Sequence, residues 1–239
     1  MKSNDIIKHS SPSSQRKKLP GKKSFNDFDK KEKWEFKRSP YAVHMKCLNL
    51  VNAKKAVLDV GCATGYFAYE LKKKGCYVVG LEKNEDSAKI AQRYCDKVIV
   101  GDAETAELPY QKYFDVLLFA DVIQYFKYPI ETLIKLRNYL KEDGYVVFSV
   151  PNVANWSIRL SLLFGDFGYR KSGILCSEHI RFFTARTIKE TLREAGFNIV
   201  SFDITTNLMG SSRFGFIRSL AGLGKNLFAH QFIIKAVMI

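Results

Sequence analysis

Apolar runs and amphipathic segments alternate along the chain from about residue 40. Continuous apolar runs are typical of strands buried on both faces, and they occur at 56–60, 77–81, 97–100, 114–119 and 145–150. Segments with helical spacing lie around them, at about 41–51, 66–74, 84–94 and 129–141. Strands that alternate with helices predict a doubly wound α/β domain, a parallel sheet with helices on both faces.

The pattern changes after the fifth apolar run, which the turn Glu142-Asp143-Gly144 is expected to introduce. Residues 151–183 mix aromatics, arginines and glycines without a clean period, so we expect a lid or substrate segment there. Thr184 predicts the start of a helix through Ala195, which Gly196 ends. A strand at 197–206, an apolar excursion at about 210–229 and a strand at 231–238 complete the pattern, and the two strands suggest an antiparallel pair at the sheet edge.

The basic charge of the chain is concentrated at its start. The whole sequence has a net charge of +14, and residues 1–38 are rich in Ser, Lys and Pro. Residues 1–40 contain 12 Lys and Arg against 5 Asp and Glu, which accounts for +7 of that charge. We therefore predict a basic, disordered arm at 1–38 and a folded domain at 39–239. Such an arm favours an anionic partner but says little about the domain.

Neither the cysteines nor the histidines are spaced as metal ligands. The sequence has five Cys, with no C-x-x-C pair, and four His. Reduced thiols in a cytoplasmic protein without a metal site are the expected state. The start of the chain lacks the apolar region of a secretory signal, and no apolar run suggests a transmembrane segment. The sequence carries no signal for the oligomeric state.

A glycine-containing loop follows the first predicted strand and is the strongest candidate for a cofactor site. Its residues are Asp59, Val60, Gly61, Cys62, Ala63, Thr64 and Gly65. Gly61 and Gly65 allow a sharp turn and a close approach of a ligand to the backbone. Their G-x-x-x-G spacing differs from the G-x-G-x-x-G pattern that places a pyrophosphate on a helix N-terminus. The loop therefore favours a nucleoside cofactor without phosphate and argues against a dehydrogenase.

Acidic residues follow the next two strands and extend this site. Glu82 ends the second strand, 21 residues after Gly61, where a carboxylate can accept hydrogen bonds from ribose hydroxyls. Asp102 follows the third strand and can accept one from the exocyclic amine of adenine. Lys83, Ala103 and Glu104 adjoin them, and Asp121 follows the fourth strand, so we include these residues in the predicted cofactor site.

The stretch from Val57 to about Ile199 resembles class I S-adenosylmethionine (SAM)-dependent methyltransferases. The resemblance lies in Leu58–Gly65, Phe114–Leu117, Ser149–Trp156 and Gly173–Thr184, of which the last two resemble a small bacterial type found in sugar and surface-polysaccharide gene clusters. It implies SAM as cofactor, a Rossmann-like sheet of seven strands with the last strand antiparallel, and a small-molecule or glycan-precursor acceptor. Many relatives have Glu-His after the fourth strand, where this chain has Asp121-Val122-Ile123-Gln124-Tyr125.

Methyl transfer mainly needs two aligned reactants, and an oxygen acceptor of high pKa also needs a base. His179, in the lid segment, is the first candidate base, with a structural role in the lid as the alternative. Asp121 could orient the acceptor, and Tyr125 could shape the site or contact the sulfonium through its ring.

Two further functions remain open at this point. The net charge allows an RNA methyltransferase, although nucleic acid is not the favoured partner because the basic excess lies in the arm. The missing Glu-His pair allows a SAM-binding accessory subunit that does not catalyse.

Overall fold

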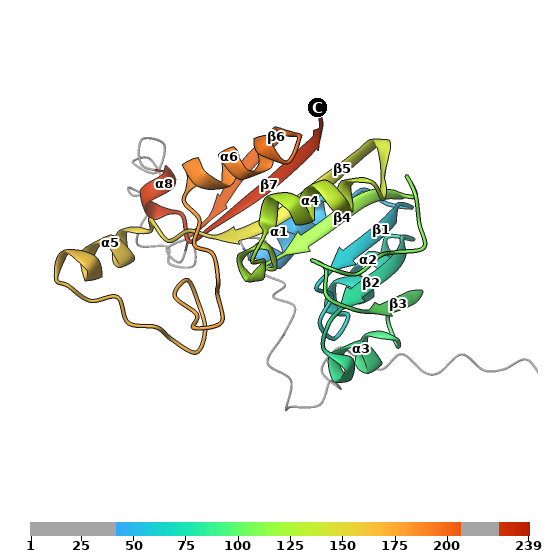
Figure 1. Cartoon of the computed structure of the whole chain (residues 1–239), viewed down its shortest axis with the longest axis horizontal. Helices are drawn as coiled ribbons and strands as arrows, with labels where there is room; N and C mark the ends of the chain where they lie inside the picture. Colours follow the sequence, from blue (N-terminus) through green and yellow to red (C-terminus); the bar gives the residue numbers. More distant parts are fainter. Residues whose placement is uncertain (1–41, 207–224) are drawn as a thin grey trace, which may run out of the picture. The chain divides into compact units, whose positions relative to one another are not determined.

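The computed structural model describes residues 42–206 and 225–239, and a seven-stranded sheet forms their centre (Figure 1). The strands are β1 (Ala56–Val60), β2 (Tyr77–Glu82), β3 (Lys97–Val100), β4 (Phe114–Ala120), β5 (Leu140–Pro151), β6 (Phe197–Thr205) and β7 (Gln231–Met238). Their order across the sheet is β3-β2-β1-β4-β5-β7-β6. The first five strands pair in parallel, and β7 pairs antiparallel with both β5 and β6. The predicted α/β fold with an antiparallel last strand is confirmed.

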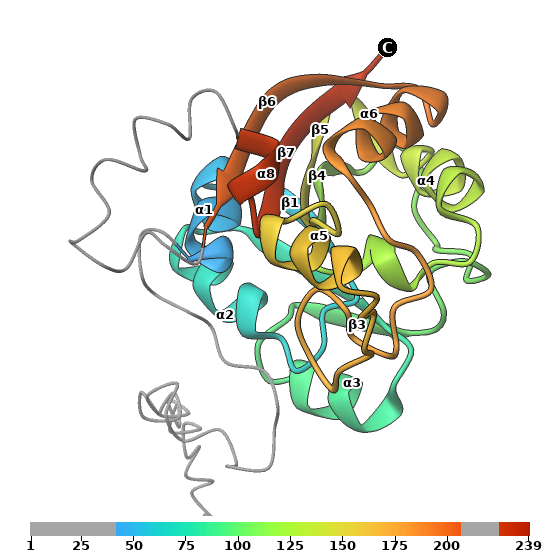
Figure 2. The same cartoon turned by 90° about the vertical axis from the view of Figure 1, so that its left-hand side faces the viewer.

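Helices cover both faces of this sheet (Figure 2). They are α1 (Val43–Leu50), α2 (Tyr66–Lys73), α3 (Glu85–Ala91), the short 3₁₀ helix η2 (Ile123–Tyr125), α4 (Pro129–Arg137), α5 (Trp156–Leu163), α6 (Ala185–Glu194) and α8 (Lys225–Phe228). In Figure 2, α1 and α2 lie on one side of the strands and α4 and α6 on the other, while α3 packs beside β2 and β3.

Local sequence signals explain where several helices begin. The side chain of Asn84 accepts a hydrogen bond from the Ser87 N–H and caps α3. Thr184 and Thr187 form a reciprocal capping box at the start of α6. In the core, Phe119 of β4 and Phe148 of β5 are fully buried and stack with ring centroids 4.7 Å apart.

One prediction about the strands is corrected and another is confirmed. The expected turn at Glu142-Asp143-Gly144 lies inside β5, which already begins at Leu140. Between the pairs Phe114–Leu140 and Val116–Tyr145, β4 advances by two residues and β5 by five, so these turn residues form an irregularity within the strand. The β6–β7 pair is antiparallel and lies at one edge of the sheet, as predicted, with β7 between β5 and β6.

The helices differ from prediction mainly in length. Helix α3 ends at Ala91 and α4 at Arg137, a few residues before the expected ends. The lid segment contains a helix, α5, that its sequence pattern did not predict. The predicted arm at 1–38 lies outside the described residues, as does most of the excursion at 210–229, of which α8 and Ala229 are described. No helix in the described ranges has the length and apolar character needed to cross a bilayer.

Candidate active site

The cofactor loop makes a tight bend between β1 and α2. Gly61 and Gly65 have φ of +68° and +82°, a left-handed conformation that favours glycine. The Gly61 N–H donates to the Leu81 carbonyl of β2 over 2.7 Å. A Cβ on Gly61 would lie 2.7 Å from the Val122 side chain, and one on Gly65 would lie 3.1 Å from the backbone of Ala91. Both glycines are therefore required by conformation and by space.

Glu82, at the end of β2, holds this loop in place. One carboxylate oxygen accepts a hydrogen bond from the Ala63 N–H over 2.9 Å, and the other accepts one from the Asn84 N–H over 2.8 Å. A carboxylate has about four acceptor positions, so Glu82 can also accept hydrogen bonds from a ligand. The side chain that was predicted to bind ribose thus also shapes the loop that would surround the ligand.

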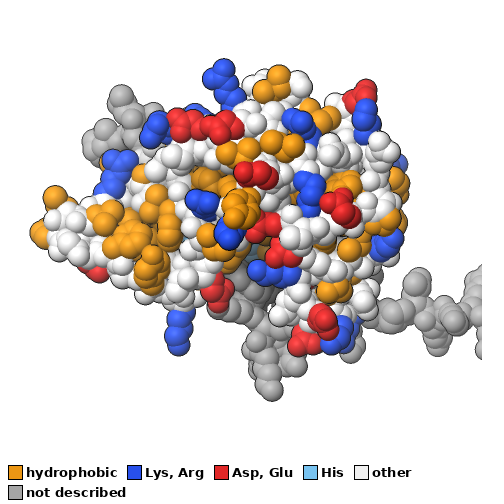
Figure 3. Space-filling model, in the orientation of Figure 1, with side chains coloured by type: hydrophobic (Ala, Val, Ile, Leu, Met, Phe, Trp, Pro, Cys, Tyr) orange, Lys and Arg blue, Asp and Glu red, His pale blue; other side chains and the backbone are white. Residues whose placement is uncertain are grey.

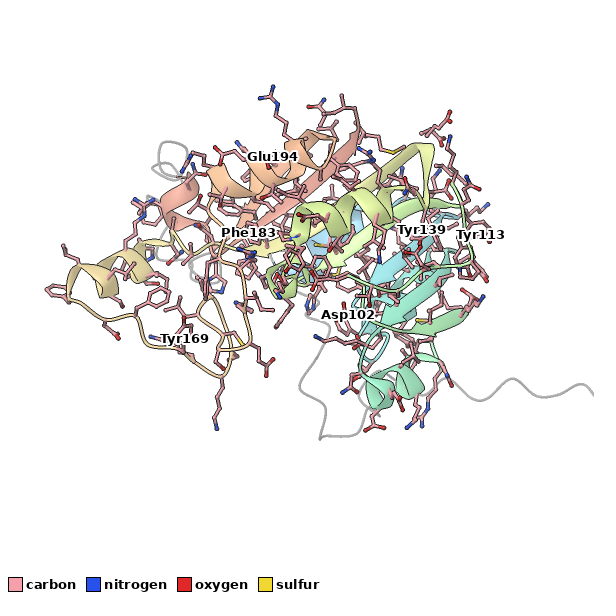
Figure 4. All side chains as sticks on the ribbon, in the orientation of Figure 1. Asp102, Tyr113, Tyr139, Tyr169, Phe183 and Glu194 are labelled. Atoms are coloured by element: carbon pink, nitrogen blue, oxygen red, sulfur yellow. The ribbon has the colours of Figure 1, made fainter. Side chains whose placement is uncertain are left out.

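Asp102 lies at the same end of the sheet as Glu82. Figure 4 shows it on the side that faces the lid segment, whereas Tyr113 and Tyr139, which precede β4 and β5, lie toward the other end. Its Oδ1 accepts a hydrogen bond from the Glu104 N–H over 2.9 Å, and Glu104 in turn accepts one from the Tyr128 N–H over 2.7 Å. These bonds order the loop after β3 with Asp102 exposed.

A cavity of about 710 Å³ connects the ends of β1–β4 with η2 and the lid segment. This volume lies within the usual range for small-molecule sites. Of the predicted site residues, nine line it: Gly61, Ala63, Glu82, Lys83, Asp102, Ala103, Glu104, Asp121 and Tyr125. Five do not: Asp59, Cys62, Thr64, Gly65 and His179. A second hollow, of about 820 Å³, is bounded by residues such as Lys112, Tyr139 and Ile239, away from the carboxyl ends of the strands where α/β sheets bind ligands.

The two predicted residues Asp59 and Cys62 are buried behind the loop. Within the described ranges, the Oδ2 atom of Asp59 has no hydrogen-bond partner, and burial, followed by the charge of Glu82, raises the pKa of Asp59 to about 8. The Cys62 thiol packs against Gly80, where a Cβ would lie only 2.5 Å from the sulfur. A hydrogen bond with Cys95 and burial raise the pKa of Cys62, so it is a neutral thiol with a packing role.

Asp121 follows β4 in a left-handed conformation, with φ of +55°. Its backbone N–H donates to the Ser149 hydroxyl over 2.8 Å, and its Oδ1 accepts a hydrogen bond from the Gln231 side chain over 2.7 Å. Gln231 begins β7, which the insertion of that strand beside β5 brings to the site. Sequence reasoning missed Gln231 because 110 residues separate it from Asp121.

The lid is attached to η2 through backbone hydrogen bonds. The Gln124 carbonyl accepts from the N–H groups of Ile180 and Arg181, both over 2.9 Å, and the Arg181 guanidinium donates to the Lys127 carbonyl over 2.6 Å. Glu178 and Ile180 consequently line the cavity. Sequence reasoning assigned neither residue to the site, and it also missed a set of neighbouring lining residues: Tyr66, Leu81, Asn84, Ser87, Gly101, Ala120, Val122, Phe126 and Lys127.

His179 is half-buried and lies in the sequence between the lining residues Glu178 and Ile180. Its Nδ1 lies 3.1 Å from the Ile174 carbonyl, which can only accept, so Nδ1 bears the proton of the neutral ring and Nε2 has the lone pair. Its ring meets that of Tyr125 edge to face, with centroids 5.1 Å apart. Burial lowers the pKa of His179 and raises the pKa of Tyr125 to about 12. Near neutral pH the imidazole is uncharged and the phenol is protonated.

This arrangement fits a cationic nucleoside better than a dinucleotide. Glu82 and Asp102 offer acceptors to hydroxyl and amine groups. Behind the loop, the unpartnered oxygen of Asp59 would be stabilised by a nearby positive charge. An open sheet with an antiparallel seventh strand and acidic strand ends is the arrangement of class I methyltransferases that use SAM.

The chain belongs to the methyltransferase domain family, whose model matches residues 33–202. Its fold is that of two solved SAM-dependent methyltransferases. The one from Thermotoga maritima has a TM-score of 0.60 and 20% identity, and the match covers 83% of this chain and 90% of that one. The one from Mesorhizobium loti has a TM-score of 0.60 and 18% identity, and the match covers 82% of this chain and 97% of that one. The family confirms the predicted cofactor, SAM.

Curated relatives match over shorter stretches. A ubiquinone biosynthesis O-methyltransferase of Acinetobacter baylyi is 21% identical over 154 residues, 62% of this chain and 65% of that protein. A malonyl-[acyl-carrier protein] O-methyltransferase of Halalkalibacterium halodurans is 30% identical over 104 residues, 40% of this chain and 38% of that protein. The chain therefore spans less than two thirds of the length of these relatives.

Proposed function

We propose that this protein transfers a methyl group from SAM to an oxygen atom of a small molecule or glycan precursor. The observation that supports it best is the single cavity that joins the carboxylates of β2 and β3 to η2 and the lid. The carboxylates would hold a nucleoside, and the acceptor would bind where Tyr125 and Glu178 line the same cavity. The O-methyltransferases among the relatives agree with an oxygen acceptor.

The residues at the strand ends would hold the cofactor. Glu82 would accept from the ribose hydroxyls and Asp102 from the adenine amine, while Lys83, Ala103 and Glu104 line the same part of the cavity. Asp59, behind the loop, would stabilise positive charge on the cofactor. The Gly61 and Gly65 bend would let the backbone approach it closely.

When bound, SAM supplies an electrophilic methyl group on a sulfonium. Asp121, held by Gln231 and Ser149, would orient the acceptor hydroxyl. Tyr125 would form one wall of the acceptor site. The acceptor oxygen would gain the methyl carbon as the bond from that carbon to sulfur breaks and the neutral thioether leaves, and the Nε2 lone pair of His179 would receive the hydroxyl proton. The contact of His179 with the lining residue Tyr125 places the imidazole next to the cavity, although His179 itself does not line it.

The proposed location is the cytoplasm. The five cysteines are all buried free thiols, as expected for a protein in a reducing compartment.

Methyl-labelled SAM tests the proposed activity. The protein is incubated with labelled SAM and a host extract separated into small molecules, glycans, RNA and protein. Label in an oxygen-linked methyl group of a small molecule or glycan precursor supports the proposal, and a Glu82→Ala variant serves as the control without cofactor binding. Label confined to RNA, or SAM binding without any transfer, would refute it in favour of an RNA methyltransferase or a non-catalytic subunit.

A further inference from the structure

The segment after β5 presents large apolar side chains to solvent. Leu163 and Phe164, at the end of α5, are 78% and 80% exposed. Further exposed apolar residues surround them, and we call the whole set the apolar tip: Trp156, Leu160, Leu162, Leu163, Phe164, Phe167 and Tyr169. Single exposed apolar side chains are common on protein surfaces, whereas a contiguous set of this size indicates a binding surface.

The exposure of the apolar tip follows from the way α5 is seated. Ile158 is the buried residue of this helix, and it packs in a small cluster with Ile174 and Leu175. Asn155 caps the helix through the Ser157 N–H, and its side-chain amide donates to the Ala229 carbonyl over 2.8 Å. The helix is therefore fixed on one face, and its other large apolar side chains are directed outward.

The apolar tip is a projection. Figure 1 shows α5 and the loop after it extending beyond the sheet at the left of the view, and Figure 2, turned so that this side faces the viewer, shows α5 in front of the strands. In Figure 3 hydrophobic side chains gather at the same outermost part of the surface. The most exposed residues, Leu163 and Phe164, are followed by Gly165 with φ of +77°, which turns the chain back.

Cationic side chains accompany the apolar tip. Between residues 156 and 173 the chain has Arg159, Arg170 and Lys171 but only one acidic residue, Asp166, and all four are exposed. The Arg159 side chain is held beside the start of α5 through its hydrogen bond to the Ala154 carbonyl, over 2.8 Å. The charge therefore complements an anionic surface.

We propose that the apolar tip inserts into the headgroup region of a lipid bilayer that contains anionic lipids. Exposed Trp, Leu and Phe beside Arg and Lys are the composition of segments that lie in a membrane interface. A convex projection suits a bilayer, which yields around it, better than a second copy of this chain, which would need a matching hollow. Binding rests on exposure, shape and charge and does not depend on the proposed methyl transfer.

Sedimentation with vesicles tests the proposal on the full chain without SAM. Vesicles of phosphatidylcholine alone are compared with vesicles that also contain phosphatidylglycerol. We expect the wild-type protein to bind the anionic vesicles, and the double variant Leu163→Ser/Phe164→Ser to bind them about a hundredfold more weakly, because two large side chains no longer leave water. The control Ile134→Ser/Val200→Ser replaces exposed apolar residues of α4 and β6 and should bind as wild type.

Tryptophan fluorescence tests whether the protein contacts the vesicles through α5. The sequence has two tryptophans, Trp34 and Trp156, so a Trp34→Phe variant reports on Trp156 alone. Its emission should shift to shorter wavelength with anionic vesicles. Three results would overturn the proposal: no vesicle binding, equal binding by the Leu163→Ser/Phe164→Ser variant, as the basic residues alone would produce, or a wild-type dimer in light scattering that this variant converts to a monomer.

Discussion

Replacing Glu82 by Gln tests the geometry on which cofactor binding depends. The carboxylate accepts hydrogen bonds from the N–H groups of both Ala63 and Asn84. A glutamine has one acceptor oxygen and one amide group that only donates, so one of these N–H groups would face another donor. The variant would also lose the charge that strengthens hydrogen bonds from ribose hydroxyls.

The size of the effect follows from these bonds. Hydrogen bonds to a charged group contribute about 1.5–3 kcal/mol each. If one ribose bond is lost and the other weakened, binding of SAM should weaken by about 3 kcal/mol, or about a hundredfold in Kd. The loss of one loop bond should also lower the melting temperature of the protein without cofactor.

Isothermal titration with SAM measures the first effect and thermal unfolding the second. Glu85→Gln is the matched control, because Glu85 is exposed, lies three residues away and does not line the cavity. That variant should bind SAM as wild type. An unchanged Kd for a folded Glu82→Gln protein would refute the assignment of Glu82 to the cofactor.

Three further predictions concern the loop and the proposed base. Gly61→Ala should cost about 2 kcal/mol of unfolding free energy in denaturant titrations, since it combines a positive φ with a contact at Val122, and unchanged stability would contradict this reasoning. His179→Ala should lower kcat about a hundredfold or more with the Kd for SAM unchanged. His179→Asn keeps a donor for the Ile174 carbonyl but has no basic nitrogen, so it should not restore turnover. Restored turnover in His179→Asn would indicate a structural role. Because folding raises the pKa of Asp59, its contribution to the free energy of unfolding should be fully present below the unfolded pKa near 3.8 and be lost as pH rises to about 8. Chemical denaturation across that pH range should show that Asp59→Asn removes this dependence.

Much of the fold could be read from the sequence because its signals are local. The apolar runs of β1 to β4 are bounded by glycines and acidic residues, and their lengths are nearly as predicted. The start of β5 was missed because Glu142-Asp143-Gly144 has the composition of a turn. Glycine is needed at position 144, because a Cβ there would lie 2.7 Å from the Leu140 side chain. The strand nevertheless continues on either side of Gly144.

The site was predictable where it follows strand ends and not where distant segments meet. Glu82 and Asp102 line the cavity because parallel strands finish together. Cys62 was included for its place in the loop, yet the direction of its side chain depends on the room that Gly80 leaves in β2. Gln231 and Ile180 reach the site through the insertion of β7 and the lid contact with Gln124, which no local pattern encodes.

The position of β7 in the sheet has a consequence for the order of assembly during synthesis. Strand β5 pairs with β7 along seven residue positions, and β7 is made after β6, which it separates from β5. A nascent chain that has emerged from the ribosome as far as β6 therefore still exposes one edge of β5. Its Asp121 also lacks the amide of Gln231. The residues of the cofactor loop precede this point in the chain, whereas the acceptor side is completed only when β7 pairs with β5 and brings Gln231 to Asp121.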